Sequence, residues 1–207
     1  MKNEQPIIDK LQPNMAWQEN GIRIFKLNQQ DAEWLSTVAK KAYFDHYTHL
    51  WFDAGAWYAE KCFNLAQIQE ELSDENAQFF GVEDETESLG FLKVNINYPL
   101  SKLTCQSKDL DLLTFDTAEI ATALELERIY LTQKGQGRGI GRRLVQVSLD
   151  VARTHGKTVV WLKAMDTSAN AIGFYTQMGF KTCATMRLNY ERMKPEMRGM
   201  IAMKTNA

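Results

Sequence analysis

Long hydrophobic stretches and paired cysteines are both missing from this sequence. Among its 207 residues no apolar run approaches the roughly 18 residues that span a bilayer, and the N-terminus lacks the basic and then apolar order of a signal peptide. The three cysteines, Cys62, Cys105 and Cys183, are widely spaced and form no CxxC pair, which argues against a disulfide framework or a thiolate metal site. We therefore expect a cytoplasmic globular protein with no membrane partner.

A strong excess of charge of one sign is missing as well. The chain has 24 Lys and Arg against 26 Asp and Glu, which gives no electrostatic support for a nucleic-acid partner. The charges are nevertheless segregated, because residues 53–87 contain ten acids and one Lys, whereas residues 128–149 contain five basic residues and no acid. We expect the acidic stretch to favour a cationic ligand and the basic stretch an anion, although such runs are also typical of ordinary solvated faces. With only three histidines, no metal site is expected.

Hydrophobic periodicity predicts one α/β (α+β) domain over residues 21–207, after a loose N-terminal extension of residues 1–20. Strand patterns occur near residues 22–27, 78–84, 89–97, 123–131, 158–164, 180–190 and 198–205. Helical spacing occurs over residues 31–47, 56–73, 140–154 and 169–178. Residues 98–122 have weak periodicity, and we interpret them as an excursion between strands. The order of elements predicts about four helices packed on a mixed sheet of about seven strands.

Residues 133–144, QKGQGRGIGRRL, place four glycines at every second position from Gly135 to Gly141. They lie between a predicted strand and a predicted helix. Such a turn lets successive backbone N–H groups point into one concavity, and the helix N-terminus adds about half a positive charge. The segment therefore predicts a phosphate site.

Two familiar phosphate loops do not fit these glycines. A P-loop needs a Lys and then a Ser or Thr after its final glycine, where this chain has two arginines. The dinucleotide pattern GxGxxG needs a third glycine where Ile140 stands. The pattern that remains is Gln136-x-x-Gly139-x-Gly141.

This pattern, after a strand and opening a helix, resembles the acyl-CoA motif of the GNAT N-acetyltransferases. A second segment, residues 170–180 (NAIGFYTQMGF), resembles a later helix of that family, with Asn170, Phe174, Tyr175, Gly179 and Phe180 in the expected order. Within the family, the chain from residue 21 onward is most similar to PaiA-type polyamine (spermidine/spermine) acetyltransferases. The N-terminal extension and the long excursion depart from that pattern, so the resemblance defines the acceptor less firmly than acetyl transfer.

The resemblance implies a mostly antiparallel sheet that is splayed between its fourth and fifth strands. It also implies that the protein uses acetyl-CoA as cosubstrate and needs no metal. It implies that the pyrophosphate lies on amides of the glycine loop and that the pantetheine arm pairs with the bulged strand before it. An amide of that strand is also the candidate oxyanion donor. The residues that the resemblance assigns to acetyl-CoA are Ile129, Tyr130, Leu131, Gln136, Gly137, Arg138, Gly139, Ile140, Gly141, Arg142 and Asn170.

Amine acetylation requires two proton transfers. A primary ammonium, with a pKa of about 10.4, must lose a proton before it attacks, and the departing thiolate must gain one. Glu127 is the candidate base, directly or through water, although Glu125 and Glu127 also fit the solvent face of an alternating strand. Tyr175 matches the acid of the family, with a core tyrosine as the alternative. We expect direct attack in a ternary complex, with a small amine, a polyamine, bound near the aromatic residues 43–58.

Two other functions fit the same motifs. One is a protein or peptide N-acetyltransferase, and the other is a catalytically silent acyl-CoA-binding module. The presence of both Glu127 and Tyr175 favours the enzyme over the silent module. Dimers are frequent among relatives, which makes a homodimer possible by analogy, but the sequence itself does not settle the oligomeric state.

Overall fold

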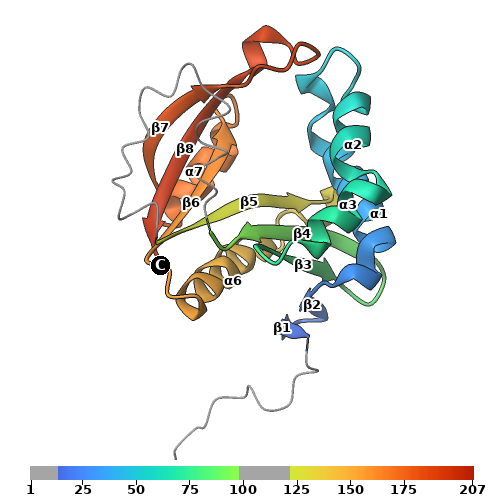
Figure 1. The fold of residues 1–207 in the computed structure, drawn as a ribbon, viewed down its shortest axis with the longest axis vertical. Coiled ribbons are helices and arrows are strands. Elements are labelled where there is room, and N and C mark those ends of the chain that lie inside the picture. Colours follow the sequence, from blue (N-terminus) through green and yellow to red (C-terminus); the bar gives the residue numbers. More distant parts are fainter. Residues whose placement is uncertain (1–13, 98–121) are drawn as a thin grey trace, which may run out of the picture.

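The computed structural model describes residues 14–97 and 122–207, which form one sheet with helices on both of its faces (Figure 1). In this part of the chain the sheet has eight strands, in the order β1-β2-β3-β4-β5-β6-β8-β7. The strands are β1 (Met15–Glu19), β2 (Ile22–Lys26), β3 (Ala77–Glu83), β4 (Ser88–Asn95), β5 (Ala123–Leu131), β6 (Val159–Met165), β7 (Lys181–Arg187) and β8 (Gly199–Asn206). The α-helices are α1 (Ala32–His46), α2 (Ala56–Phe63), α3 (Leu65–Ser73), α6 (Ile140–Thr154) and α7 (Ala169–Gln177).

The pairing of the strands confirms the predicted fold class. All neighbouring strands are antiparallel except β5 and β6, which are parallel and are connected through α6. A parallel pair needs such a crossover, whereas antiparallel neighbours can be joined by short turns. The described sheet has one strand more than the sequence predicts, and five α-helices lie on it instead of about four.

Each face of the sheet has its own apolar core. On one face, Leu144 of α6 packs against Leu126 of β5. On the other, Leu35 of α1 and Ile68 of α3 pack against Phe91 of β4. Because successive residues of a strand point to opposite faces, β4 and β5 contribute side chains to both cores.

The additional strand, β1, lies in the segment expected to be a loose extension. Glu19 pairs with Ile22, so only Asn20 and Gly21 connect β1 to β2. Both connecting residues have positive φ, 51° and 75°, which is the conformation that a two-residue Asn-Gly hairpin turn requires. Trp17 of β1 packs against the core on the α6 side. The extension therefore becomes part of the sheet from Met15 onward.

The predicted helix over residues 56–73 is two helices, α2 and α3. Asn64 between them has an extended backbone, and its side chain accepts a hydrogen bond from the Gln67 N–H at 2.9 Å. An Asn in this position caps the second helix and ends the first. The other predicted helices match α1, α6 and α7 to within a residue or two.

Some expectations lie outside the described residues, namely those for residues 1–13 of the extension and 98–121 of the excursion. Within the described ranges, no helix combines the length and the apolar character needed to cross a membrane.

Strands β5 and β6 separate soon after they begin. They pair only from Ala123 with Val159 to Leu126 with Leu162, although β5 continues to Leu131. The sheet therefore divides into a first arm, β1–β5 with α1–α3, and a second arm, β6–β8 with α7 (Figure 1). Because the sequence does not predict β1, β5 and β6 are the fourth and fifth strands of the sequence prediction, and the splay lies where it is expected.

The two arms meet again at the far end, through a contact that we call the strap, residues 50–53 against residues 190–194. Trp51 forms an isolated β-bridge with Met193. The Phe52 N–H donates to the Arg192 carbonyl at 3.1 Å, and the Lys194 N–H donates to the Leu50 carbonyl at 3.0 Å. The arms are thus joined at both ends and separate between them.

Candidate functional site

The glycine loop, residues 133–141, connects the end of β5 to α6. Gly137 and Gly139 have φ values of +73° and +77°, a region that strains other residues, and a Cβ on either would meet nothing within 4 Å. Helix α6 begins within this segment, at Ile140, and is 15 residues long. The loop therefore exposes bare backbone beside open space at the N-terminus of a long helix, which is an arrangement that binds phosphate.

The basic side chains of this segment differ in what they contact. Arg143 lies over an aromatic ring of β1, at 4.6 Å from its centre, and pairs with Glu19 at 3.7 Å. Lys134 and Arg138 also form ion pairs with carboxylates. Arg142 is exposed and donates to the sulfur of Met178 at 3.3 Å. Among the described residues, Arg142 is the basic side chain of residues 134–143 that has no carboxylate partner. Arg142 is therefore the side chain most available to an anion.

Among the described residues, the backbone groups of β5 at the edge that β6 leaves have no strand partner. The Thr132 N–H donates to the Leu89 carbonyl at 2.9 Å, so residue 132 faces β4. Because backbone groups alternate in direction along a strand, those of Tyr130 also face β4, whereas those of Ile129 and Leu131 face the open edge. Ile129 and Leu131 can therefore pair with an extended ligand, and Tyr130 cannot do so through its backbone.

Tyr175 lies on α7 and belongs to the second arm. Its ring packs against Phe174 and Phe180, with ring centres 5.0 and 5.7 Å away. Burial raises the pKa of the Tyr175 hydroxyl, and the nearby phenol of Tyr47, which directly follows α1 in the first arm, raises it further. Tyr175 therefore keeps its proton at neutral pH and lies near the place where the two arms face each other. Asn170, in the first turn of the same helix, is exposed.

An aromatic cluster fills the first arm between α1 and the strap. Its members are Tyr43, Tyr47, Trp51, Trp57, Tyr58, Phe63, Tyr130 and Tyr190. The ring of Tyr130 lies 5.2 Å from that of Tyr47, which connects the cluster to β5. At its outer end the Lys61 ammonium lies 5.0 Å from the ring centre of Trp57. The cluster can therefore hold a cation against a ring face.

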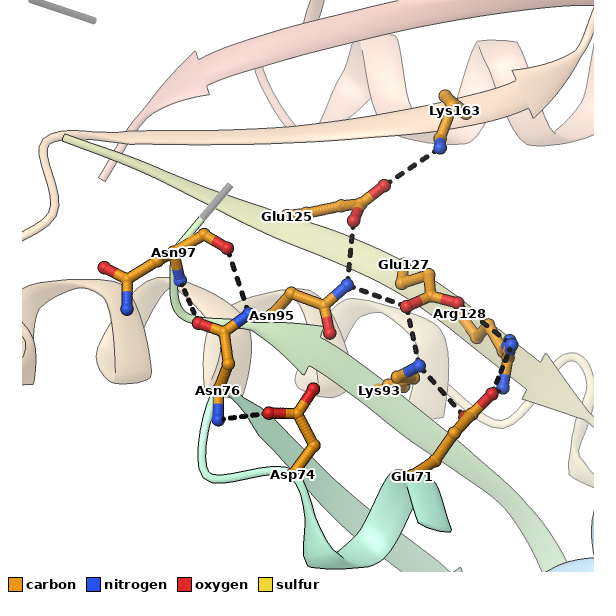
Figure 2. Close-up of polar contacts among 10 residues, drawn as sticks. All are labelled: Glu71, Asp74, Asn76, Lys93, Asn95, Asn97, Glu125, Glu127, Arg128 and Lys163. Atoms are coloured by element: carbon orange, nitrogen blue, oxygen red, sulfur yellow. Dashed lines mark hydrogen bonds and ion pairs between the residues drawn. The ribbon is translucent and has the colours of Figure 1, made fainter. Parts of the chain in front are cut away.

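Glu127 occupies a bulge in β5. Lys93 of β4 pairs with Arg128, and the next residue, Val94, pairs with Leu126, so Glu127 has no partner opposite it. A bulge of this kind places two successive residues on the same face of a strand. It explains why Glu127 and Arg128 both reach the α3 side of the sheet, where Figure 2 shows them facing each other.

The Glu127 carboxylate is held by a network of buried charges (Figure 2). It lies 2.8 Å from the Lys93 ammonium and 3.0 Å from the Arg128 guanidinium, and both cations also contact Glu71 of α3, at 2.9 and 2.7 Å. The Asn95 amide donates to Glu127 at 2.7 Å. All of these side chains are largely buried, with exposed fractions between 6 and 19% for the charged ones.

The network continues toward β6 and balances its charges. The Asn95 amide also donates to Glu125, and Glu125 pairs with the Lys163 ammonium at 3.0 Å. Burial raises the pKa of Glu127, but the charges of Arg128 and Lys93 outweigh burial and hold that pKa well below its usual range. Glu127 is therefore ionised and fully paired, which makes it a weak base when it acts directly.

The acids of residues 53–87 do not gather at one site. Six of the ten form ion pairs with side chains of this chain: Asp53 with Arg192, Glu60 with Lys40, Glu71 with Lys93 and Arg128, Glu83 with Arg23, Asp84 with Arg138, and Glu87 with Lys134. These pairs lie on several different elements. The expectation of an acidic surface that attracts a cationic ligand is therefore not supported by the arrangement of these acids.

Comparison with known proteins agrees with this geometry. A model of the Acetyltransferase (GNAT) family matches residues 38–180. An uncharacterized N-acetyltransferase in the pepI 3′ region of Lactobacillus delbrueckii subsp. lactis is 24% identical over 163 residues, which cover 77% of this chain and 84% of that protein.

Two solved structures share the fold. The PaiA N-acetyltransferase from Thermoplasma acidophilum in complex with coenzyme A has a TM-score of 0.65 at 18% identity, over 90% of this chain and 99% of that one. The spermidine N-acetyltransferase from Vibrio cholerae in complex with CoA and spermine has a TM-score of 0.62 at 15% identity, over 91% and 96%. Together with the family match, which spans more than half of the sequence, these findings show that the chain belongs to the GNAT family of acetyl-CoA-dependent N-acetyltransferases.

Proposed function

We propose that this protein transfers the acetyl group of acetyl-CoA to a primary amine of a polyamine, by direct attack in a ternary complex. The main support for the proposal is that β5, the glycine loop and α6 follow one another directly in the chain. One strand–loop–helix unit offers free strand backbone at its edge and then phosphate-binding amides at a helix N-terminus. Coenzyme A contains the matching parts in the same order, an extended pantetheine arm followed by a pyrophosphate.

Each part of coenzyme A then has candidate partners. In our proposal the pyrophosphate binds the N–H groups of residues 137–141, and Arg142 adds a charge-assisted hydrogen bond. The pantetheine arm pairs with the open backbone groups of Ile129 and Leu131, as an added strand would. One of these two N–H groups also stabilises the oxyanion that forms on the acetyl carbonyl. Asn170 is exposed on α7 and is assigned to the same ligand by the family pattern.

The reaction forms one N–C bond and breaks one C–S bond. The amine must lose a proton, and the low pKa of Glu127 favours relay through a water molecule over direct abstraction by this carboxylate. Tyr175 donates its phenolic proton to the departing thiolate. Its pKa is raised, so the hydroxyl is protonated at neutral pH, as a proton donor must be.

The polyamine assignment has two supports. Proteins that share this fold include one named spermidine N-acetyltransferase, solved with spermine. The aromatic cluster also offers ring faces of the kind on which Lys61 and Arg192 already lie, and an alkylammonium binds such a face in the same way. The paired acids of residues 53–87 do not add to this support.

Thiol release from acetyl-CoA tests the proposal. The purified protein is assayed with spermidine, spermine, shorter diamines, amino acids and short peptides, and Tyr175→Phe is assayed in parallel as the catalytically impaired control. We expect release with polyamines and little with the other acceptors. Release with peptides alone would retain acetyl transfer and reject the polyamine. Binding of acetyl-CoA without release for any acceptor would favour the silent acyl-CoA-binding module.

A further inference from the structure

The residues that separate the glycines of the loop all make contacts outside it. Glycine and a larger residue alternate from residue 134 to residue 139. The contacts of the larger residues are Lys134 Nζ to Glu87 Oε1 at 2.6 Å, Gln136 Nε2 to His46 Nε2 at 3.0 Å, and Arg138 Nη1 to Asp84 Oδ2 at 2.8 Å. Every larger side chain in this stretch is thus engaged by a partner from another element.

The partners come from two elements that border the loop. Asp84 and Glu87 lie on the turn between β3 and β4, and His46 ends α1. The turn is itself well ordered by hydrogen bonds, because the Asp84 carboxylate accepts from the N–H groups of Thr86 and Glu87 at 2.9 and 3.1 Å. Helix α1 adds a second contact, in which Asp45 accepts from the Gln133 N–H at 2.8 Å.

These contacts affect how the loop can bind acetyl-CoA, because they engage its cationic side chains. Arg138 is engaged by Asp84, so its guanidinium is not free for phosphate while this ion pair persists. Two carboxylates beside a pyrophosphate would weaken its binding by charge alone, yet here both are neutralised by cations of the loop. A loop with two glycines in the left-handed region has much conformational entropy to lose, and fixing it beforehand lowers the cost of binding.

We propose that Asp84, Glu87 and His46 are positioning residues for acetyl-CoA. They hold the side chains of Lys134, Arg138 and Gln136 outward, and thereby fix the backbone amides of the loop in the arrangement that binds the pyrophosphate. Arg138 accordingly acts through Asp84 and does not ligate phosphate. The inference rests on the proposed assignment of the loop to acetyl-CoA.

A double-mutant cycle tests this inference. Asp84→Asn, Arg138→Gln and the double variant are compared with wild type by calorimetric titration with acetyl-CoA and by steady-state kinetics. We expect each single substitution to raise the Kd and the KM for acetyl-CoA about five-fold, and the double variant to be no worse than either single one. The kcat at saturation and the acceptor KM stay unchanged. The matched control is Glu83→Gln, which breaks an ion pair of the same type with Arg23 one residue away and leaves the loop untouched.

The other outcomes of the cycle overturn the inference in distinct ways. Tighter binding by Asp84→Asn with weaker binding by Arg138→Gln would make Arg138 a phosphate ligand for which Asp84 competes. Additive losses would mean that the two residues act independently. Unchanged Kd values in all variants would show that the ion pair has no role in binding. A wild-type protein that does not bind acetyl-CoA would overturn the assignment of the loop itself.

Discussion

A tyrosine can protonate a departing thiolate only if it still holds its proton at the pH of the reaction. Tyr175 meets this condition, because burial and the neighbouring phenol of Tyr47 both raise its pKa. It lies on α7 of the second arm and interacts electrostatically with Tyr47 of the first arm. Burial raises the pKa of the tyrosines of the aromatic cluster as well, but their rings pack mainly on one another, so the position of Tyr175 on the second arm is what distinguishes it.

We expect Tyr175→Phe to lower kcat by about 100-fold, because general-acid catalysis contributes a factor of this size. The Kd for acetyl-CoA should change little, since only the hydroxyl is removed and the ring still packs against Phe180. Single-turnover kinetics and calorimetric titration measure the two quantities. If Tyr47→Phe reduces kcat instead and Tyr175→Phe does not, the proton donor is Tyr47.

Gly139→Val should abolish measurable acetyl-CoA binding while the protein remains folded. A Cβ at this position meets nothing within 4 Å, so the side chain would occupy the open space where we place the ligand. The φ value of +77° adds a strain of about 1–2 kcal/mol for a branched residue. Titration with acetyl-CoA and the circular-dichroism melting curve check the two parts. Unaltered affinity would remove the glycine loop from the acetyl-CoA site.

The sequence identifies the candidate catalytic residues better than their surroundings. Glu127 and Tyr175 can be chosen from motifs, because each stands at a fixed place relative to a strand or a helix pattern. The partners of Glu127 come from other elements, Lys93 on β4 and Glu71 on α3, and no local pattern connects them. Lys93 does give one signal, since a lysine in the middle of the apolar strand LGFLKVNIN must be paired when it is buried.

At the scale of elements, β5 combines three features in nine residues: parallel pairing, a bulge and an open edge. The bulge turns two charged residues toward α3, and the buried network there compensates them. Removing one partner of such a network leaves a charge without compensation, whereas removing an exposed pair costs little. The network thus stabilises the strand from which the site is built.

Lys93→Met should lower the free energy of unfolding by about 3 kcal/mol at pH 7, because Glu127 and Glu71 lose a buried partner. The folded-state pKa of Glu127 is lowered, so its ion pairs stabilise the protein above the unfolded pKa of about 4.3 and this contribution is lost as the pH falls. The difference between variant and wild type should therefore shrink below that pH. Urea titrations at several pH values measure it.

The matched control for this measurement is Lys40→Met, which removes an exposed pair with Glu60 at 3.7 Å. It should cost less than about 0.5 kcal/mol at any pH. An equal cost for the two substitutions would mean that the buried network contributes no more than a surface pair.

Two features that are predicted wrongly from the sequence, strand β1 and the break between α2 and α3, nevertheless have recognisable local signals. The Asn20-Gly21 pair between MAWQE and IRIFK predicts a hairpin, and with it strand β1. Asn64 inside a helical pattern predicts a cap and therefore two helices. The pairing of β5 with β6 over only four residues has no such signal, because it depends on the packing of the two arms.

At the scale of the whole molecule, the two arms are joined by the short β5–β6 pairing and by the strap. Both the glycine loop and the strap border the C-terminal end of α1, because Asp45 and His46 contact the loop and the strap begins at residue 50. Trp51 belongs to both the strap and the aromatic cluster, which connects the strap to the proposed acceptor side. The strap therefore acts on the acceptor side through Trp51 and the aromatic cluster.

The connection of the strap to the aromatic cluster through Trp51 predicts a selective effect of Met193→Ala on the acceptor. Met193 is 2% exposed and packs in the core that includes the aromatic cluster, so truncation leaves a cavity and costs about 2 kcal/mol or more of local packing. We expect the acceptor KM to rise about five-fold, because the strap positions the cluster, while the KM for acetyl-CoA stays unchanged. Met203→Ala on β8 of the same arm, which is 1% exposed and lies outside the strap, serves as the control for general destabilisation. Equal increases in both KM values would mean that the strap sets the spacing of the arms around both substrates.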